Sequence, residues 1–371
     1  MILKSKYLIN KRMPIEWLLK YMSILRLILG NYSNVHKSKP VCFALRLYCI
    51  FATFTFNAIY WCYNNSRFSI YFLNIIQYTC INLVYLKYSD DLFFDFINTI
   101  KTIDRIIGFR KLTSVTRFLW LILTINVIIR IVVTFIHYFY KLRHIYSFFN
   151  VLFVLIGLDI NYFINILVFS LLHSRINRLK VFLESNSVPI NITGRNEVEA
   201  CVKNIRKCLK YYSDLLDIFE HMDKQLQCLI TVTWFMESVS LTVSTYNAIR
   251  NHLLQILVAS TFMELSTAFM KLSSQAGVVT ATMHEVDEMK HILTTQLLRT
   301  SDESIRFELE TTLQYITLRP FRYDICHFVP LNIHLPIAVI SLCTTYVIVA
   351  LQLTHFNEGT VYSFKNFTSI I

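Results

Sequence analysis

Five charged side chains lie inside long apolar segments of this sequence, and their chemistry is the first feature that needs explanation. They are Arg46, Arg130, Asp159, Glu237 and Glu264. A charge surrounded by hydrocarbon is costly, so such residues usually form a buried pair or line a ligand or ion pathway. Arg130, Asp159 and Glu237 are expected at similar depth, so that one of the two carboxylates neutralises the arginine. Two hypotheses follow: an ion pair that fixes helix packing, or the polar floor of a ligand cavity.

Aromatic side chains gather toward one end of the same segments, the end that the charge distribution described below places outside the cell. They are Tyr60, Trp61, Phe72, Phe135, Tyr138, Phe148, Phe149, Tyr246 and Phe262. Aromatic walls combined with a few polar groups suit a small organic ligand. The sequence therefore offers a candidate pocket with Arg130, Asp159 and Glu237 at its floor. Rings that face lipid or form the interfacial aromatic belt are the alternative.

Enzymatic and metal chemistry find little support in the sequence. The glycine-rich, Walker, metalloprotease and nucleophile-elbow motifs are all missing from it. His284 and His291 flank three acidic residues, but their spacing disperses them around an exposed helix and predicts a solvated face. The nine cysteines are odd in number and contain no C-x-x-C pair, which indicates neither a disulfide framework nor a zinc site. We therefore expect no enzyme activity, no cofactor and no metal.

The composition is that of an integral membrane protein. Hydrophobic residues make up 54% of the 371 positions and charged residues only 16%, whereas soluble proteins carry about 25% charged residues. A helix needs about 20 apolar residues to cross a bilayer. Segments that meet this requirement are predicted near 41–63, 69–87, 117–140, 146–173, 228–249, 253–274 and 334–354. We expect an all-α protein with seven transmembrane helices.

Lys and Arg are unevenly distributed among the connecting segments. They are concentrated in the N-terminal segment and in every second loop, and the net charge is +12. The positive-inside rule then predicts a cytoplasmic N-terminus and an extracellular C-terminus. The membrane topology explains the excess of basic residues, which would lie beside membrane lipid. We therefore expect no nucleic-acid partner. Two glycosylation sequons, at Asn64 and Asn366, fall on the predicted outer side.

Two long inner loops carry helical patterns of their own. Apolar residues recur at three-and-four spacing over 198–219, with lysines and arginines on the other face, which predicts an amphipathic helix that prolongs the fifth span into the cytosol. A similar stripe after Met283 is expected to pack against it, and helices on the membrane surface are the alternative. The predicted organisation is a cytoplasmic segment 1–39, helices one to six with their extensions over 40–275, cytosolic anchor helices over 276–332, and a final helix with a short extracellular tail over 333–371.

The final apolar segment carries the most specific motif in the chain. Thr345 and Tyr346 are followed by five apolar residues, then by Gln352 and Leu353. This pattern resembles the signature of insect gustatory receptors, which also have seven spans and an inside N-terminus. The stretch 322–328 resembles the segment that leads into their last helix. The chain departs from the family pattern at Leu353, where Phe is usual, and at His327, where Gly is usual.

The resemblance implies a ligand-gated cation channel in the plasma membrane of chemosensory neurons. Four subunits, identical or mixed with other gustatory receptors, would each contribute a seventh helix to a central pore. Its pore and gate residues would be Thr345, Tyr346, Val349, Gln352 and Leu353. A small-molecule tastant bound among helices one to six would open the gate without G proteins.

The residues of the last helix favour such a pore independently of the resemblance. Val349 and Leu353 are four positions apart and share a helical face, so four copies would form apolar rings that gate by dewetting. Gln352 lies about 100° around the helix from Leu353, and a modest rotation would exchange the two at the constriction. Thr345 shares the face of Gln352, and Glu358 follows where a ring of four carboxylates would attract cations. Hydrogen bonding of Gln352 to a neighbouring helix is the alternative.

Two other function classes stay open on the sequence alone. The chain could be an obligate channel subunit that binds no ligand, or a transporter, for which inverted repeats and helices broken by Gly or Pro are expected. Only Gly157 interrupts a predicted span near its middle. The candidate pocket is rich in aromatic residues and poor in the carboxylates and amides that polyols favour, which points to bitter or unassigned small organic ligands.

Overall fold

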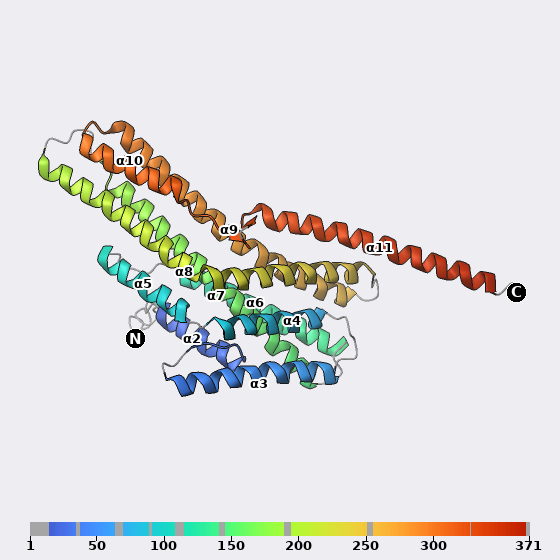
Figure 1. Cartoon of the computed structure of the whole chain (residues 1–371). Helices are drawn as coiled ribbons and strands as arrows, with labels where there is room; N and C mark the ends of the chain where they lie inside the picture. The colour runs from blue at the N-terminus through green and yellow to red at the C-terminus, as the bar shows by residue number, and fades with distance from the viewer. Residues whose placement is uncertain are drawn as a thin grey trace, which may run out of the picture.

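The computed structural model describes residues 15–34, 38–63, 70–88, 91–107, 115–140, 145–188, 194–250, 255–326 and 328–368. These residues form long helices and one small antiparallel hairpin (Figure 1). The elements are α2 (Ile15–Ile28), α3 (Lys39–Tyr63), α4 (Ile70–Lys87), α5 (Asp91–Ile107), α6 (Val115–Tyr140), α7 (Ile145–Ser185), α8 (Arg195–Arg250), α9 (Gln255–Arg299), α10 (Glu303–Leu318), β1 (Asp324–Ile325), β2 (Val329–Pro330) and α11 (His334–Thr368). The predicted all-α fold class is confirmed.

Several helices are long and apolar enough to cross a membrane. Among the described residues four meet that requirement: Lys39–Cys62, Ile145–Ser185, Lys224–Ile249 and His334–Thr354. A shorter apolar stretch, Thr124–Ile136, lies within α6. The predicted spans 69–87 and 253–274 correspond to α4 and the start of α9, which polar and charged residues dilute. The number of membrane spans remains a prediction. The side of the membrane on which each terminus lies is also a prediction.

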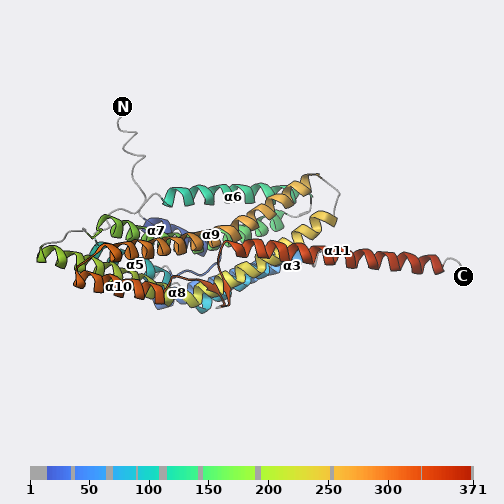
Figure 2. The ribbon, with the colours of Figure 1, turned by 90° about the horizontal axis from the view of Figure 1, so that it is seen from above.

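Helix α7 is the centre of the bundle. It packs against α3, α4, α6, α8 and α9, and Figure 2 shows α6 along the upper edge of the bundle and α8 along its lower edge. Between Leu158 and Leu172 every residue is buried. A stretch that is buried on every side is shielded from both water and lipid, and a charge there is stable only when it is paired. Asp159 on this helix must therefore find its partners inside the protein.

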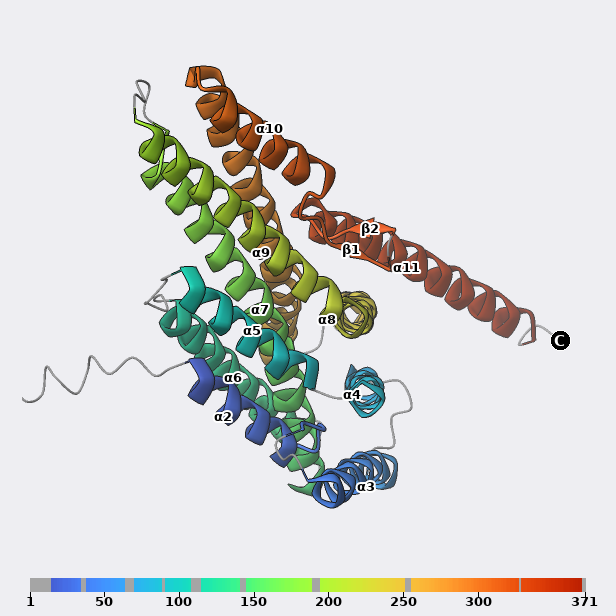
Figure 3. The same cartoon turned by 60° about the vertical axis from the view of Figure 1, so that its left-hand side comes forward.

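Helices α8 and α9 extend well past the apolar part of the bundle. Helix α8 joins the amphipathic stripe to the apolar segment 228–249 in one run of 56 residues, as predicted. Helix α9 likewise continues for 45 residues, and α10 packs against both (Figure 3). The two apolar stripes meet, as predicted, with Leu215 and Met289 fully buried. Lys203 and Arg206 lie on the exposed face.

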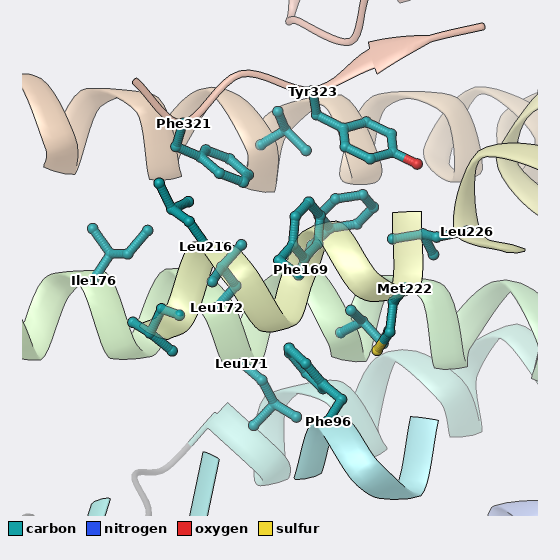
Figure 4. Packing of buried hydrophobic residues seen from close by; sticks show 14 of the residues in the cluster. Phe96, Phe169, Leu171, Leu172, Ile176, Leu216, Met222, Leu226, Phe321 and Tyr323 are labelled. Atoms are coloured by element: carbon teal, nitrogen blue, oxygen red, sulfur yellow. The ribbon is translucent and has the colours of Figure 1, made fainter. Parts of the chain in front are cut away.

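An aromatic cluster joins this extended bundle to the segment that leads into α11. Phe169 of α7 and Phe219 of α8 pack against Phe321 and Tyr323, with neighbouring ring centroids between 5.1 and 5.9 Å apart. Figure 4 shows Phe169, Phe321 and Tyr323 above the part of the core that α5 completes with Phe96. Edge-to-face aromatic contacts add about 0.5–1.5 kcal/mol each beyond area burial. The approach to α11 is thereby held firmly to α7 and α8.

Helix α5 is tied to the same bundle by a buried ion pair. Arg175 Nη2 lies 2.5 Å from Asp104 Oδ2, and the Tyr211 hydroxyl donates a hydrogen bond of 3.3 Å to the other carboxylate oxygen. Burial raises the pKa of Asp104, although the Arg175 guanidinium acts in the opposite direction. The pair fixes α5 against α7 and α8.

A glycine allows the tight turn that follows α2. Gly30 has a positive φ of 77°, a conformation that favours glycine. The Tyr78 hydroxyl donates a hydrogen bond of 2.5 Å to the carbonyl of Leu29 beside it. A Cβ atom at position 30 would lie 2.7 Å from that hydroxyl oxygen and 2.9 Å from the Ala52 Cβ. Both backbone angle and space therefore require glycine here.

We predict that Gly30→Ala destabilises the protein by about 1–3 kcal/mol, because both the left-handed backbone and the close contacts oppose a side chain. Thermal unfolding of the detergent-solubilised protein measures the effect as a lower Tm. Gly277→Ala is the matched control, since nothing lies within 4 Å of a Cβ at that helical position, and we expect a gain of about 0.5–1 kcal/mol there. Equal Tm values for the two variants would contradict this account of the turn.

Candidate functional site

Four charged side chains from four helices meet in the interior of the bundle. Arg130 Nε of α6 lies 2.9 Å from Asp159 Oδ2 of α7. Lys271 Nζ of α9 lies 2.9 Å from Asp159 Oδ1 and 2.9 Å from Glu237 Oε1 of α8. All four residues are buried, with at most 7% of any of them exposed. Two cations balance two anions, which satisfies the charge requirement of a buried ionic network.

The network contains three residues that the sequence singled out and one that it missed. Asp159 is the carboxylate that pairs with Arg130, whereas Glu237 pairs with Lys271. Lys271 lies near the end of the predicted span 253–274, where a lysine would ordinarily reach the membrane surface. Its spacing of seven from Glu264 places both on one face of α9, and this was the available signal that Lys271 points inward.

Helix α9 is also bound to α7 by a tyrosine next to the network. The Tyr162 hydroxyl donates a hydrogen bond of 2.8 Å to the backbone carbonyl of Lys271 and contacts the Ser274 hydroxyl. On the other side, Trp234 Nε1 of α8 donates a hydrogen bond of 2.9 Å to the side-chain oxygen of Gln275 on α9. These contacts hold α7, α8 and α9 in one register around the charges.

A small polar cavity adjoins the network. Its lining residues come from α4, α6, α8 and α9: Asn74, Arg130, Glu237, Ser240, Leu241, Ser244, Glu264, Leu265 and Ala268. Its volume is about 20 Å³, enough for roughly one water molecule, since a water needs about 10–15 Å³. Sites that enclose whole organic ligands measure about 300–1,000 Å³. The cavity can hold one small group of a ligand but not a complete organic molecule.

The predicted pocket aromatics are distributed over several environments. Tyr60, Trp61 and Phe72 form one cluster with ring centroids 5.9–6.2 Å apart. Tyr60 is buried, whereas Phe72 and Tyr246 are half-buried. Exposed rings are those of Trp61, Phe135, Phe149 and Phe262. The side chains of Tyr138 and Asn366, and the whole of Asn64, lie outside the described residues. The structure thus joins Tyr60, Trp61 and Phe72 in one cluster and leaves Phe135, Phe149 and Phe262 exposed outside it.

Over residues 334–354, helix α11 contacts the bundle along one face. Cys343 and Val347 are buried, and Cys343 packs with Leu241 of α8 and Ala268 of α9. The predicted pore residues form the opposite, exposed surface: Thr345, Tyr346, Val349, Gln352 and Leu353. Gln352 forms no hydrogen bond with another described residue, so no contact within the described part of the chain occupies its amide. His327 and the side chain of Glu358 lie outside the described residues.

The seat of α11 and the polar cavity share their walls. Leu241, Leu265 and Ala268 line the cavity and also belong to the apolar cluster around Cys343. Closely packed interiors have few voids to absorb a change in volume, so a larger occupant of the cavity would press on the surface on which α11 rests. The cavity and the seat of the final helix share these three side chains.

The acidic and histidine-rich turn of α9 has the environment that the sequence indicated. His284 and Glu288 are exposed, with His284 Nε2 4.0 Å from the Glu288 carboxylate. In the part of the chain that the structure describes, no group of three or more His, Cys, Asp or Glu residues is placed to hold a metal ion. His284, His291, Asp287 and Glu288 thus lie on the solvated surface of the helix, whereas the Glu285 side chain is 14% exposed and forms an ion pair with Lys180.

Apolar helices of membrane length around a compensated ionic core define a helical membrane protein. A family model described as 7tm Chemosensory receptor matches residues 86–354, from the end of α4 to Thr354 in α11. The match covers more than half of the chain, which therefore belongs to this family, that of the insect gustatory and odorant receptors. The resemblance read from the last helix is thereby confirmed. No curated protein matches the chain. The family supports a chemosensory receptor role and is not an enzyme family.

We predict that Asp159→Asn lowers the stability of the folded protein by about 3–5 kcal/mol, because it leaves Arg130 buried without its counter-charge. The measurement is thermal unfolding in detergent, together with the amount of protein that reaches the cell surface. Asp287→Asn is the control, since it removes an exposed ion pair with Lys290 of the kind that contributes about 0–1 kcal/mol. A network without structural importance would show the same small loss in both variants.

Proposed function

We propose that this chain is a gustatory receptor that acts as a ligand-gated, non-selective cation channel in the plasma membrane of chemosensory neurons. Seven helices would cross the membrane, with the N-terminus inside and the C-terminus outside. Four copies, alone or mixed with other gustatory receptors, would surround a pore lined by α11. Membership of the chemosensory receptor family supports the receptor role.

The observation that carries the channel proposal is the two-sided character of α11. Its buried side rests on α8 and α9, and its exposed side carries Val349 and Leu353, which are 45% and 60% exposed. In an assembly with a central axis these apolar side chains would form two rings. Apolar constrictions of this kind close a pore by excluding water.

The unoccupied amide of Gln352 supports the opening step. It lies next to Leu353 on the exposed side of α11, about 100° around the helix. A rotation or outward tilt of α11 would replace the apolar ring by amides and let the constriction fill with water. Thr345 would continue this polar surface along the helix.

The ligand in this proposal is a small organic molecule, bitter or unassigned, bound among α3, α4, α6, α7, α8 and α9. The aromatic cluster of Tyr60, Trp61 and Phe72 would supply apolar walls, and the ionic network would supply the floor. The water-sized cavity favours a second candidate, an obligate channel subunit that binds no ligand of its own. A transporter is less well supported, because α7 runs unbroken through Gly157.

Expression of the chain alone and together with other gustatory receptors separates these candidates. A calcium-imaging screen first identifies active compounds, and patch recording then examines the currents. Currents from the single chain support a self-sufficient receptor, whereas currents only from mixtures support the subunit. Transport of ligand without unitary currents would support a transporter.

We predict that Gln352→Ala reduces agonist-evoked current by roughly tenfold or more while surface expression is retained. Four amides that hydrogen-bond to pore water would be lost, at about 0.5–1.5 kcal/mol each, and the open state would be disfavoured. Whole-cell recording measures the effect, with exposed Gln314→Ala on α10 as the control. Unchanged currents and ion permeability in Gln352→Ala would argue against a pore-facing amide.

We predict that Glu358→Gln lowers calcium permeability relative to sodium permeability. A ring of carboxylates at the pore mouth raises the local concentration of cations, and of divalent cations most strongly. Reversal potentials in solutions of different calcium concentration give the ratio, and the sodium current serves as the internal control. An unchanged ratio would remove Glu358 from the pore mouth.

A further inference from the structure

Two serines on α8 direct their hydroxyl groups differently from their neighbours. Thr233, Ser238, Thr242 and Thr245 each donate a hydrogen bond to the backbone carbonyl four residues earlier. Such bonds satisfy a hydroxyl within its own helix. Ser240 and Ser244, one turn apart, form no hydrogen bond with any described residue, and both line the polar cavity. Their hydroxyls are therefore available to an occupant of the cavity.

The burial of Ser244 favours such an occupant. Only 2% of this residue is exposed, and a buried polar group without a partner costs free energy. Asn74 of α4 lines the same cavity and also forms no hydrogen bond with another described residue. The hydroxyl groups of the two serines and the amide of Asn74 thus line a cavity of about 20 Å³. A space of this size accepts one water molecule or one hydroxyl group.

The charges around the cavity disfavour an anionic occupant and favour one that can donate a hydrogen bond. Arg130, Glu237 and Glu264 line it, and Arg130 and Glu237 already have oppositely charged partners in the ionic network. A carboxylate would be repelled by Glu237 and Glu264. A hydroxyl carries one donor and two acceptor sites. It can donate to the Glu237 carboxylate while it accepts from the Arg130 guanidinium or Ser244.

The position of the cavity connects its occupant to the final helix. Leu241, Leu265 and Ala268 separate the cavity from Cys343 of α11. A ligand hydroxyl attached to a carbon skeleton occupies more room than the water that it replaces. Its entry would push these three side chains toward α11, which rests on them.

We propose that the cavity between α4, α6, α8 and α9 is a binding site for a hydroxyl group of the ligand, with Ser244 and Ser240 as specificity-determining residues. The agonists of this chain are accordingly small alcohols. This proposal rests on the proposed function, because it assigns the ligand class of the same receptor.

Matched pairs of probes test the site directly. Hexanol, cyclohexanol, phenylethanol and glycerol are each compared with their fully methylated ethers, which keep the oxygen but add a methyl group to it and cannot donate a hydrogen bond. Binding is measured as a rise in the Tm of the full-length detergent-purified protein, and activation as current in cells. We expect at least one alcohol to raise Tm and its ether to fail.

Serine variants then assign the effect to the cavity. We expect Ser244→Ala to raise the alcohol concentration needed for half-maximal effect by about tenfold, as the loss of one hydrogen-bonding partner predicts. Ser240→Ala should raise this concentration as well. Ser266→Ala is the control, because this exposed serine of α9 bonds to the Phe262 carbonyl of its own helix. The control should match the parent protein.

The outcomes distinguish this proposal from the proposed function. If alcohols and ethers act equally, or if Ser244→Ala responds like the parent, the hydroxyl site is overturned while the currents still support a channel. An alcohol that raises Tm through Ser244 but evokes no current supports the site and contradicts the channel. If no alcohol changes Tm or current, the hydroxyl site is overturned.

Discussion

Charge compensation in the interior of the bundle is the constraint on which the arrangement of the helices depends. Arg130, Asp159, Glu237 and Lys271 come from four different helices, and each charge needs its partner because the apolar surroundings solvate it poorly. Asp159 accepts from two cations, so neither α6 nor α9 can shift along α7 without exposing a charge to hydrocarbon. The hydrogen bonds of Tyr162 and Trp234 fix the same helices at neighbouring positions. The seat of α11 on α8 and α9 follows from this register.

Because α8 and α9 are long, the register set at the ionic network also fixes parts of the bundle far from it. Each helix runs without interruption from the ionic network to the bundle that it forms with α10. The aromatic cluster around Phe219 and Tyr323 then holds the segment that leads into α11. The final helix is thus held near its beginning by aromatic packing and along one face by α8 and α9. Its remaining surface is left to lipid, to a lumen or to other subunits, which is where the proposed pore residues lie.

Features that depend on local spacing could be predicted before the tertiary structure was considered. The stripe over 198–219 indicated a helix continuous with the next apolar segment, and α8 has that form. Arg130 inside an apolar segment indicated a buried carboxylate partner, because an isolated charge is too costly there. Lys271 was missed, because a lysine near the end of a span is normally expected to reach water. The polar cavity was missed as well, since its lining comes from four helices that are far apart in the chain.

The order of amino acids by itself determined which stretches are helical, which of their faces are apolar, and to which receptor family the chain belongs. These properties depend on periodicity and on short motifs, and both are complete within a few turns of one helix. Only the tertiary structure decided that Asp159 pairs with Arg130 and Lys271, that Ser240 and Ser244 face a cavity, and that Leu265 and Ala268 separate this cavity from α11. Partners that lie tens of residues apart are chosen by how helices pack and rotate against one another, and helical periodicity alone leaves that choice open.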